Sequence, residues 1–255
     1  MPMTDSETSP TLSTAALDQL ARPDLLTQKS VDPLTEDLAL ALLQSREMVP
    51  EAIEHLSKNA IVTKSRKVRF ALASHPRAPR HLSLRLVREF YTIDLMRFAL
   101  LPAVAADIKH AADDLLVSRL ASVTLGERIS LARRASGTVA AALLLDKESR
   151  VWHTALENPR LTEAAVLKTL LRLNGNAAFV EVVCHHSKWS PRPEIRMALL
   201  RNDNTPLARA LEFAKSVAPA QLRDILYNSR LPEKIKTCLQ KELDTTKERE
   251  SEKSH

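Results

Sequence analysis

A stretch of 21 residues recurs three times in this chain, and this repetition limits the possible folds more than any other feature. The copies are VRFALASHPRAPRHLSLRLVR (68–88), VWHTALENPRLTEAAVLKTLL (151–171) and IRMALLRNDNTPLARALEFAK (195–215). Each begins with a β-branched apolar residue, has a small residue three positions later and carries leucine at its seventeenth position. Self-similarity of this kind is typical of helical repeat arrays, in which each unit buries its apolar face only by stacking on its neighbours.

Each copy predicts a pair of short helices joined by a turn. Apolar residues three and four positions apart give the first helix one buried face. A polar residue that favours a helix end follows, at His75, Asn158 and Asn202. A residue that favours a helix start comes four positions later, at Pro79, Thr162 and Pro206.

Weaker copies extend the pattern along the chain. Val49–Asn59 is interpreted as a degenerate first helix that ends at Asn59, and Gly137 is expected in a turn. Residues 1–30 are rich in Ser, Thr, Pro and Asp, and residues 244–255 are charged. We therefore expect a disordered leader over 1–30, a helical array over 31–243 and a disordered tail over 244–255. The other expected helices cover 33–46, 90–101, 103–120, 127–135, 138–146, 177–186, 218–228 and 231–243.

The pattern apolar-x-x-Ala-Leu-x-x-Asn-Pro-x-Thr/Ala-Pro resembles the leucine-rich repeat variant and the HEAT-like repeats of bacterial α-solenoid proteins. Segments 131–159 and 195–232 are also similar to a group of uncharacterised bacterial repeat proteins. The resemblance covers about residues 50–240. It implies an all-α fold, a right-handed solenoid of short HEAT-like helix pairs, and it brings no catalytic motif and no assigned activity. Some variant-repeat proteins hold an iron–sulfur centre in a cysteine cluster, which this chain lacks, since it has only Cys184 and Cys238.

The composition argues against a catalytic or metal site. With 3 glycines the chain has no glycine-rich phosphate loop, and the GxSxG and HExxH motifs are missing from the sequence. Cys184, His185 and His186 are adjacent, but neighbouring residues on a helix point about 100° apart and no second cluster supplies further ligands. We therefore expect no enzyme, no metal and no cofactor.

The sequence also predicts a cytoplasmic protein. No apolar run approaches the roughly 18–20 residues of a membrane span, and the opening MPMTDSETSP lacks the order of a signal peptide. Two cysteines far apart favour reduced thiols over a structural disulfide. We expect no membrane partner, and no small-molecule substrate is evident.

Charge is distributed unevenly along the chain. Residues 1–60 contain 4 Lys/Arg and 10 Asp/Glu, a net charge of −6, whereas residues 61–100 contain 9 Lys/Arg and 2 Asp/Glu, a net charge of +7. Phosphate binding needs such a positive field. The alternative is a solvated face that pairs with the acidic N-terminal 60 residues. The candidate surface consists of Lys64, Arg66, Lys67, Arg77, Arg80, Arg85 and Arg88. Arg77 and Arg80, like Arg85 and Arg88, are three positions apart and are expected to share a helix face.

Trp152 and Trp189, beside the starts of repeat helices, complete the candidate binding surface. They are interpreted either as core residues or as aromatic side chains against which a ligand or a flipped base stacks. A HEAT-like DNA-repair enzyme would need such an aromatic side chain and an acid in one groove, and no spacing in the sequence singles out that set.

The sequence therefore predicts a non-enzymatic scaffold whose concave face binds another protein. A nucleic-acid-associated protein that uses the basic residues 64–88 is the alternative, and a HEAT-like DNA-repair enzyme is a third. Alignment of the basic residues along one strip would favour nucleic acid, and their scatter would favour the scaffold. The partner, the oligomeric state and the number of repeats are left open by the sequence.

Overall fold

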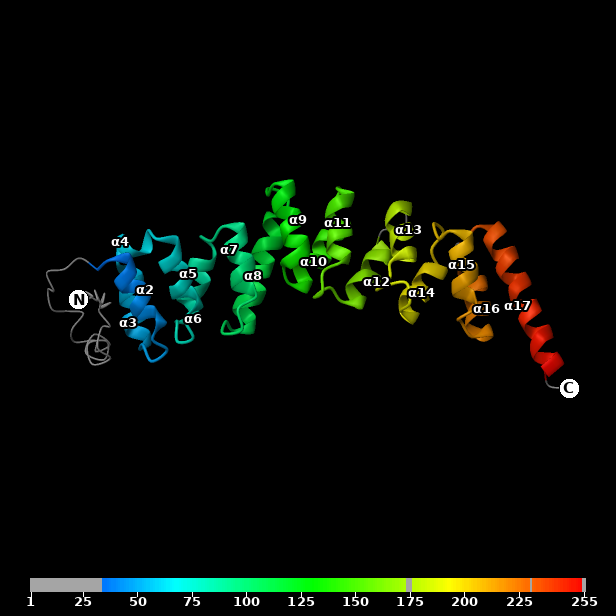
Figure 1. The fold of residues 1–255 in the computed structure, drawn as a ribbon, viewed down its shortest axis with the longest axis horizontal. Coiled ribbons are helices and arrows are strands. Elements are labelled where there is room, and N and C mark those ends of the chain that lie inside the picture. The colour runs from blue at the N-terminus through cyan, green and yellow to red at the C-terminus, as the bar shows by residue number, and fades with distance from the viewer. Residues whose placement is uncertain (1–33, 173–175, 230, 254–255) are drawn as a thin grey trace, which may run out of the picture. The chain divides into compact units, whose positions relative to one another are not determined.

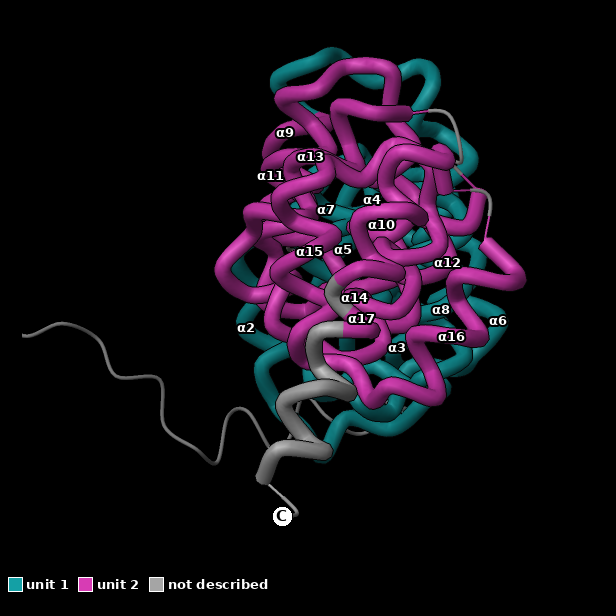
Figure 2. The backbone as a smooth tube through the Cα atoms, turned by 90° about the vertical axis from the view of Figure 1, so that its right-hand side faces the viewer, with its two compact units in different colours: residues 1–127 teal, residues 128–255 magenta. Residues whose placement is uncertain are grey.

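The computed structural model describes residues 34–172, 176–229 and 231–253, and the expected leader over 1–30 lies outside this part of the chain. The described residues form helices and short connections, with no strand among them, so the prediction of an all-α protein is confirmed. The chain divides into two compact units, residues 1–127 and residues 128–255 (Figure 2).

The helices of unit 1 follow one another in antiparallel pairs (Figure 1). Helices α5 and α6 pack on each other, as do α7 and α8. Helix α5 also contacts α2 and α7, while α6 contacts α8, so that first helices lie along first helices and second helices along second helices. The elements are α2 (Glu36–Gln44), α3 (Pro50–Lys58), α4 (Ala60–Thr63), α5 (Arg66–Ser74), α6 (Arg80–Val87), α7 (Thr92–Ala99) and α8 (Ala106–Arg119), and the unit boundary falls within α9 (Leu125–Arg134).

The apolar spacing of each pair explains its packing. The buried residues of α6 recur at intervals of three and four, as Leu82, Ser83, Leu86 and Val87. Polar Ser83 is accommodated there because its hydroxyl donates a hydrogen bond of 2.9 Å to the carbonyl of Ala73 in α5. The two helices of this pair are thus joined by apolar contacts and by one buried hydrogen bond.

The interpretation of Val49–Asn59 as a first helix is wrong. Helix α2 packs along α5 and takes the place of the first helix, so α3 is the second helix of that pair. The sequence feature that indicates a second helix here is Pro50, in the first turn of α3. It corresponds to Pro79, which stands at the start of the second helix in the next pair. Asn59 lies between α3 and α4, where its side chain accepts hydrogen bonds from the amides of Ile61 and Val62 and caps α4.

Unit 2 contains further short helices and one long helix at its end. Helix α10 contacts α11 and α12, α12 contacts α14, and α15 contacts α14 and α17. The elements are α10 (Gly137–Leu143), α11 (Ser149–Leu156), α12 (Glu163–Arg172), α13 (Ala177–His185), α14 (Pro193–Leu200), α15 (Leu207–Ala214), α16 (Pro219–Asn228) and α17 (Glu233–Lys253).

Two details of unit 2 differ from the expectations. Gly137 is the first residue of α10, capped by the Ser136 hydroxyl, and does not lie in a turn. A Cβ atom at Gly137 would lie 2.5 Å from the carbonyl oxygen of Arg160, so the glycine permits a close backbone approach. Helix α17 continues to Lys253, through the charged segment 244–253 for which disorder was expected.

Buried polar side chains at the turns connect successive helix pairs. In unit 1, Nδ1 of His75 accepts a hydrogen bond of 3.1 Å from the amide of Arg77, and Nε2 lies 3.0 Å from the carbonyl oxygen of Ser45, at the end of α2. Since Nδ1 is an acceptor, the ring is the neutral tautomer with its proton on Nε2. One side chain therefore closes its own turn and bonds the turn of the preceding pair.

Asn158 and His186 do the same in unit 2. The Asn158 carbonyl group accepts from the amide of Arg160 at 2.8 Å, and its Nδ2 donates to the carbonyls of Ala132 at 2.8 Å and Ala135 at 3.2 Å. Nδ1 of His186 accepts from the amide of Lys188 at 3.1 Å. Its Nε2 lies 3.1 Å from a carboxylate oxygen of Glu157, beside the preceding turn. Two of the three helix-end residues of the sequence repeat, His75 and Asn158, thus make buried contacts between turns, and His186 makes a similar one outside the three copies. The third helix-end residue, Asn202, accepts a hydrogen bond of 3.0 Å from the amide of Asn204 in its own turn.

Candidate functional site

The candidate basic residues lie at two opposite ends of the α5–α6 pair. One end carries the C-cap of α4, the first two residues of α5 and the last turn and C-cap of α6, namely Lys64, Arg66, Lys67, Arg85 and Arg88. At the other end, Arg77 lies in the turn and Arg80 is the first residue of α6. A helix of nine residues is about 13 Å long. The residues therefore do not form one continuous strip, and the expectation that Arg77 and Arg80 share a helix face is wrong, because only Arg80 is helical.

Three of the seven candidate basic residues form ion pairs with neighbouring helices or turns. Arg66 pairs with Asp94 and Arg80 with Asp107, while Arg77 donates to both the carboxylate and the backbone carbonyl of Glu47 at 3.1 Å. The hydrogen bond from Arg80 lowers the pKa of Asp107. Much of the positive charge that the sequence places between residues 64 and 88 is thus balanced locally.

The two tryptophans belong to the core and are removed from the candidate binding surface. Trp152 is 3% exposed, with its ring parallel to His153 and edge-on to Phe179 at a centroid distance of 5.4 Å. Trp189 is 1% exposed, and its indole N–H donates to the carbonyl of Leu156 at 2.9 Å. A large apolar ring with a satisfied donor is stable in such a place. Neither tryptophan offers a face on which a ligand or a base could stack.

The Cys184, His185 and His186 segment has structural contacts. Burial raises the pKa of the Cys184 thiol to about 11, so this thiol is protonated at neutral pH. His186 joins the turn contacts described above, and Nδ1 of His185 lies 2.9 Å from the carbonyl oxygen of Glu181. Within the described residues, no group of three or more His, Cys, Asp or Glu side chains could hold a metal ion.

A hollow of about 440 Å³ lies between α5 and α7 and unites residues that the sequence did not bring together. Helix α5 contributes Arg66, Lys67 and Phe70, and α7 contributes Asp94 and Arg97. Arg66 and Phe70 are four residues apart, and Asp94 and Arg97 are three apart, so each set faces the hollow from one side of its helix. We call this site the α5–α7 hollow.

The apolar part of the α5–α7 hollow is an aromatic cluster. Phe70 stacks on Phe90 with a centroid distance of 5.6 Å, and Phe98 lies edge-on to both rings, at 6.1 Å from Phe70 and 5.6 Å from Phe90. Phe90 and Phe98 are buried, whereas Phe70 is half-buried and lines the hollow. The cluster gives the hollow an apolar surface that is fixed by packing.

Arg66 is held in place at the edge of this surface. Its Nε and Nη2 donate to the two carboxylate oxygens of buried Asp94, the second at 2.7 Å, and its guanidinium carbon lies 5.2 Å from the ring centroid of Tyr91. The hydrogen bond with Asp94 raises the pKa of the guanidinium. Tyr91 is 65% exposed, which is unusual for so large a side chain next to a hollow.

The cations Lys67 and Arg97 remain available beside Arg66. Both are exposed, and neither forms an ion pair with any residue that the structure describes. Lys67 lies in the first turn of α5, where the helix dipole already produces positive potential and favours acidic side chains. A cation in this position reduces the stability of the helix and increases the attraction for an anion.

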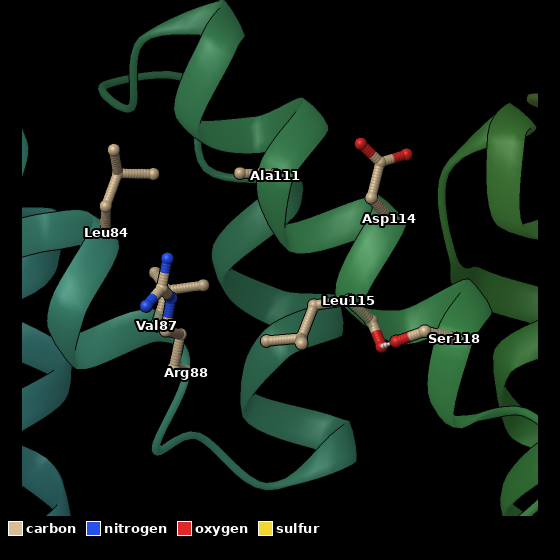
Figure 3. A pocket seen from close by; sticks show the side chains of 7 residues that line it. All are labelled: Leu84, Val87, Arg88, Ala111, Asp114, Leu115 and Ser118. Atoms are coloured by element: carbon tan, nitrogen blue, oxygen red, sulfur yellow. Dashed lines mark hydrogen bonds between the residues drawn. The ribbon is translucent and has the colours of Figure 1, made fainter.

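A second hollow, of about 370 Å³, lies between α6 and α8 (Figure 3). It is lined by Leu84, Val87 and Arg88 from α6 and by Ala111, Asp114, Leu115 and Ser118 from α8. The Ser118 hydroxyl donates to the carbonyl of Leu115 at 2.8 Å within its own helix. With one cation and one anion in its lining, this hollow has no charge preference that would select a partner.

Comparison with protein-family models, with curated proteins and with solved structures finds no match for this chain. The resemblance to bacterial repeat proteins therefore stays a prediction. None of the helices in the described ranges combines the length and the apolar character that a membrane span requires.

Proposed function

We propose that this chain is a non-enzymatic, cytoplasmic repeat scaffold that binds a partner protein, and that its helix pairs stack as an α-solenoid. The stacking is supported by the contacts of α5 with α2 and α7 and by the buried turn residues His75, Asn158 and His186, which bond preceding turns. A stack of pairs presents its first helices side by side, which makes an extended surface for a partner.

The observation that carries the proposal is the α5–α7 hollow. It is lined by the half-buried ring of Phe70 and by Lys67 and Arg97, which form no ion pair with a described residue. The exposed ring of Tyr91 lies against Arg66 at its edge. Tyr and Arg are enriched among the residues that dominate protein–protein binding energy.

The experiment that tests the proposal is affinity capture with the full chain. The immobilised protein is incubated with a nuclease-treated lysate of its source cells, and retained proteins are identified and then purified for direct binding measurements. We expect at least one protein that binds the purified chain in a saturable way. Absence of any saturable protein partner would contradict the scaffold function.

Nucleic-acid binding is the second candidate, favoured by the exposed Lys64, Lys67 and Arg88 at one end of the α5–α6 pair. Because phosphate contacts release counterions, true binding to DNA or RNA would weaken steeply with salt. We expect no more than weak binding of random double- and single-stranded DNA and RNA at low salt, since Arg66, Arg77 and Arg80 are already paired. Tight, salt-dependent binding that is lost when Arg85 and Arg88 are changed to Glu would favour this candidate over the scaffold.

A further inference from the structure

We propose that the α5–α7 hollow binds a short acidic segment of a partner protein, with one apolar side chain of that segment against Phe70 and flanking carboxylates on Lys67 and Arg97. The inference rests on the proposed scaffold function and specifies the chemistry of its partner. It follows from the size, the charge and the rigidity of the site.

The size of the hollow suits side chains better than a folded surface. A volume of about 440 Å³ falls in the range of about 300–1,000 Å³ that is typical of pockets for small ligands. Such a space accepts one or two side chains of an extended segment, while the rest of the segment runs over the exposed ring of Tyr91. Half-buried Phe70 supplies the apolar contact inside.

The charges of the site select carboxylates. Both carboxylate oxygens of Asp94 accept hydrogen bonds from Arg66. Because this ion pair balances the charge of Asp94, the carboxylate does not repel an anion as a free one would. Lys67 and Arg97 are left as two cations on facing helices. The dipole at the N-terminus of α5 adds to their field. A segment with acidic residues on both sides of an apolar one complements this arrangement.

Among the described residues that line the hollow, Lys67 and Arg97 form no ion pair, and two such cations are too few for a nucleic acid as the main ligand. Proteins that bind duplex DNA by its backbone commonly neutralise about 6–10 phosphates along a continuous path. In the described part of unit 1, Arg69 of α5 pairs with Glu89 at 3.1 Å, Arg80 pairs with Asp107 at the other end of α6, and Lys64, Arg85 and Arg88 do not line the hollow. The positive field is therefore local, as an acidic peptide requires.

The site is also prepared for binding before a partner arrives. Arg66 is fixed by Asp94 and by the ring of Tyr91, and Phe70 is fixed by Phe90 and Phe98. Side chains that are already ordered lose little conformational entropy on binding, which favours useful affinity from a small contact area.

The experiment measures fluorescence polarisation of labelled dodecapeptides with the full chain. The acidic–apolar probe has three glutamates around a central leucine–phenylalanine pair. A second probe replaces the glutamates with glutamine, and a third replaces the leucine–phenylalanine pair with alanines. We expect the acidic–apolar probe to bind at least about tenfold more tightly than either control, since a tenfold change corresponds to about 1.4 kcal/mol, the scale of one charge-assisted contact.

Each of two matched variants reverses two charges, one pair in the lining of the α5–α7 hollow and the other outside it. The double variant Lys67→Glu/Arg97→Glu should weaken binding of the acidic–apolar probe by about 100-fold or more, one tenfold factor for each cation. The control Arg85→Glu/Arg88→Glu makes the same change of net charge at the end of α6, at two residues that do not line the α5–α7 hollow, and should change binding less than about threefold. All four residues are exposed, and unchanged circular dichroism melting would verify that the variants fold.

Several results would overturn the inference. Equal binding of the glutamate and glutamine probes, or equal loss in the two double variants, would show that the α5–α7 hollow does not select acids. Tighter binding of a 12-nucleotide DNA than of the acidic–apolar probe would assign the cations to nucleic acid. A partner from affinity capture that binds the Lys67→Glu/Arg97→Glu variant as well as the wild-type chain would leave the scaffold function standing and refute this site.

Discussion

Arg66 and Asp94 occupy the same position in two successive first helices and bind each other through two hydrogen bonds. Arg66 begins α5, and Asp94 lies in the first turn of α7, 28 residues later. The spacing matches the echo of Val68-Arg69-Phe70 in Met96-Arg97-Phe98. One repeat position thus carries a cation in one copy and an anion in the next, and the contact between copies is attractive at that point.

This pair makes a first prediction about stability. Asp94 is 6% exposed, and its replacement by alanine removes two charge-assisted hydrogen bonds and a favourable charge in the first turn of α7. We expect Asp94→Ala to lower the free energy of unfolding by about 1–3 kcal/mol in urea titrations. The control is Asp107→Ala, which breaks the more exposed pair with Arg80 and should cost clearly less, because exposed ion pairs contribute little to stability. Equal effects of the two substitutions would contradict the special role of Asp94.

The turn contacts make a second prediction. Asn158 is completely buried and makes three hydrogen bonds to backbone groups of Arg160, Ala132 and Ala135. Asn158→Ala leaves these groups without a partner in the core, and we expect a loss of about 2–4 kcal/mol in urea unfolding. Asn158→Asp keeps the acceptor but replaces the amide donor with a charge, and it should destabilise at least as much. A milder effect of the aspartate would show that the bonds from Nδ2 contribute little.

His186 makes the third prediction, which concerns pH. Burial lowers the pKa of His186, opposed by Glu157 and assisted by the charges of Lys188 and His153. The folded state therefore binds fewer protons than the unfolded state, whose histidine pKa is about 6.5. This contribution to stability is complete above about pH 6.5 and is lost as the pH falls toward the lowered pKa, by at most about 1.4 kcal/mol per pH unit.

The matched variant is His186→Asn, since Asn158 performs the corresponding role with an amide in the same unit. Thermal melting of the wild-type chain and of this variant is compared between pH 7.5 and pH 5.5. We expect the wild-type melting temperature to fall more than that of the variant, because asparagine does not titrate. A parallel decline of the two would assign the acid sensitivity to other groups.

Periodicity predicted the helices because it depends on local spacing. The three copies of the repeat placed helices at α5–α6, α11–α12 and α14–α15, and the residues His75, Asn158 and Asn202 lie at or just after the ends of α5, α11 and α14. Helix α14, however, packs along α12, which is a second helix, so the phase of the third copy differs from that of the other two. The helix-end pattern did not predict that the side chains of His75 and Asn158 also reach the preceding turn. That second contact depends on how the pairs stack, which no local spacing encodes.

The candidate site was predicted only in part, for a similar reason. Arg66 and Lys67 were singled out by charge, but Phe70 and Arg97 were not, because charge counting along the chain does not show which cations form ion pairs or which residues of α5 and α7 lie together. The signal that could have found Arg97 was its place in the Met96-Arg97-Phe98 echo, which puts it on a first helix next to α5. The tryptophans were listed with the candidate surface while a core position stayed open, because the spacing allowed either face. The contact of Trp152 with Phe179 and the hydrogen bond from Trp189 to the carbonyl of Leu156 place both in the core.

Gly126 and Gly137, which lie in the first turns of α9 and α10, make the last prediction, because alanine should act in opposite directions at them. Neither has a positive φ angle, so the backbone conformation admits alanine at both positions. At Gly137 the new Cβ would lie 2.5 Å from the carbonyl oxygen of Arg160, a backbone atom that cannot move alone, whereas at Gly126 it would meet nothing within 4 Å. We expect Gly137→Ala to destabilise by about 1–3 kcal/mol through overpacking, and Gly126→Ala to stabilise by about 0.5–1 kcal/mol through helix propensity and reduced entropy of the unfolded chain. The free energies of unfolding of both variants are measured by urea titration. An alanine at position 137 that stabilises the protein would contradict the close contact between the carbonyl of Arg160 and the start of α10.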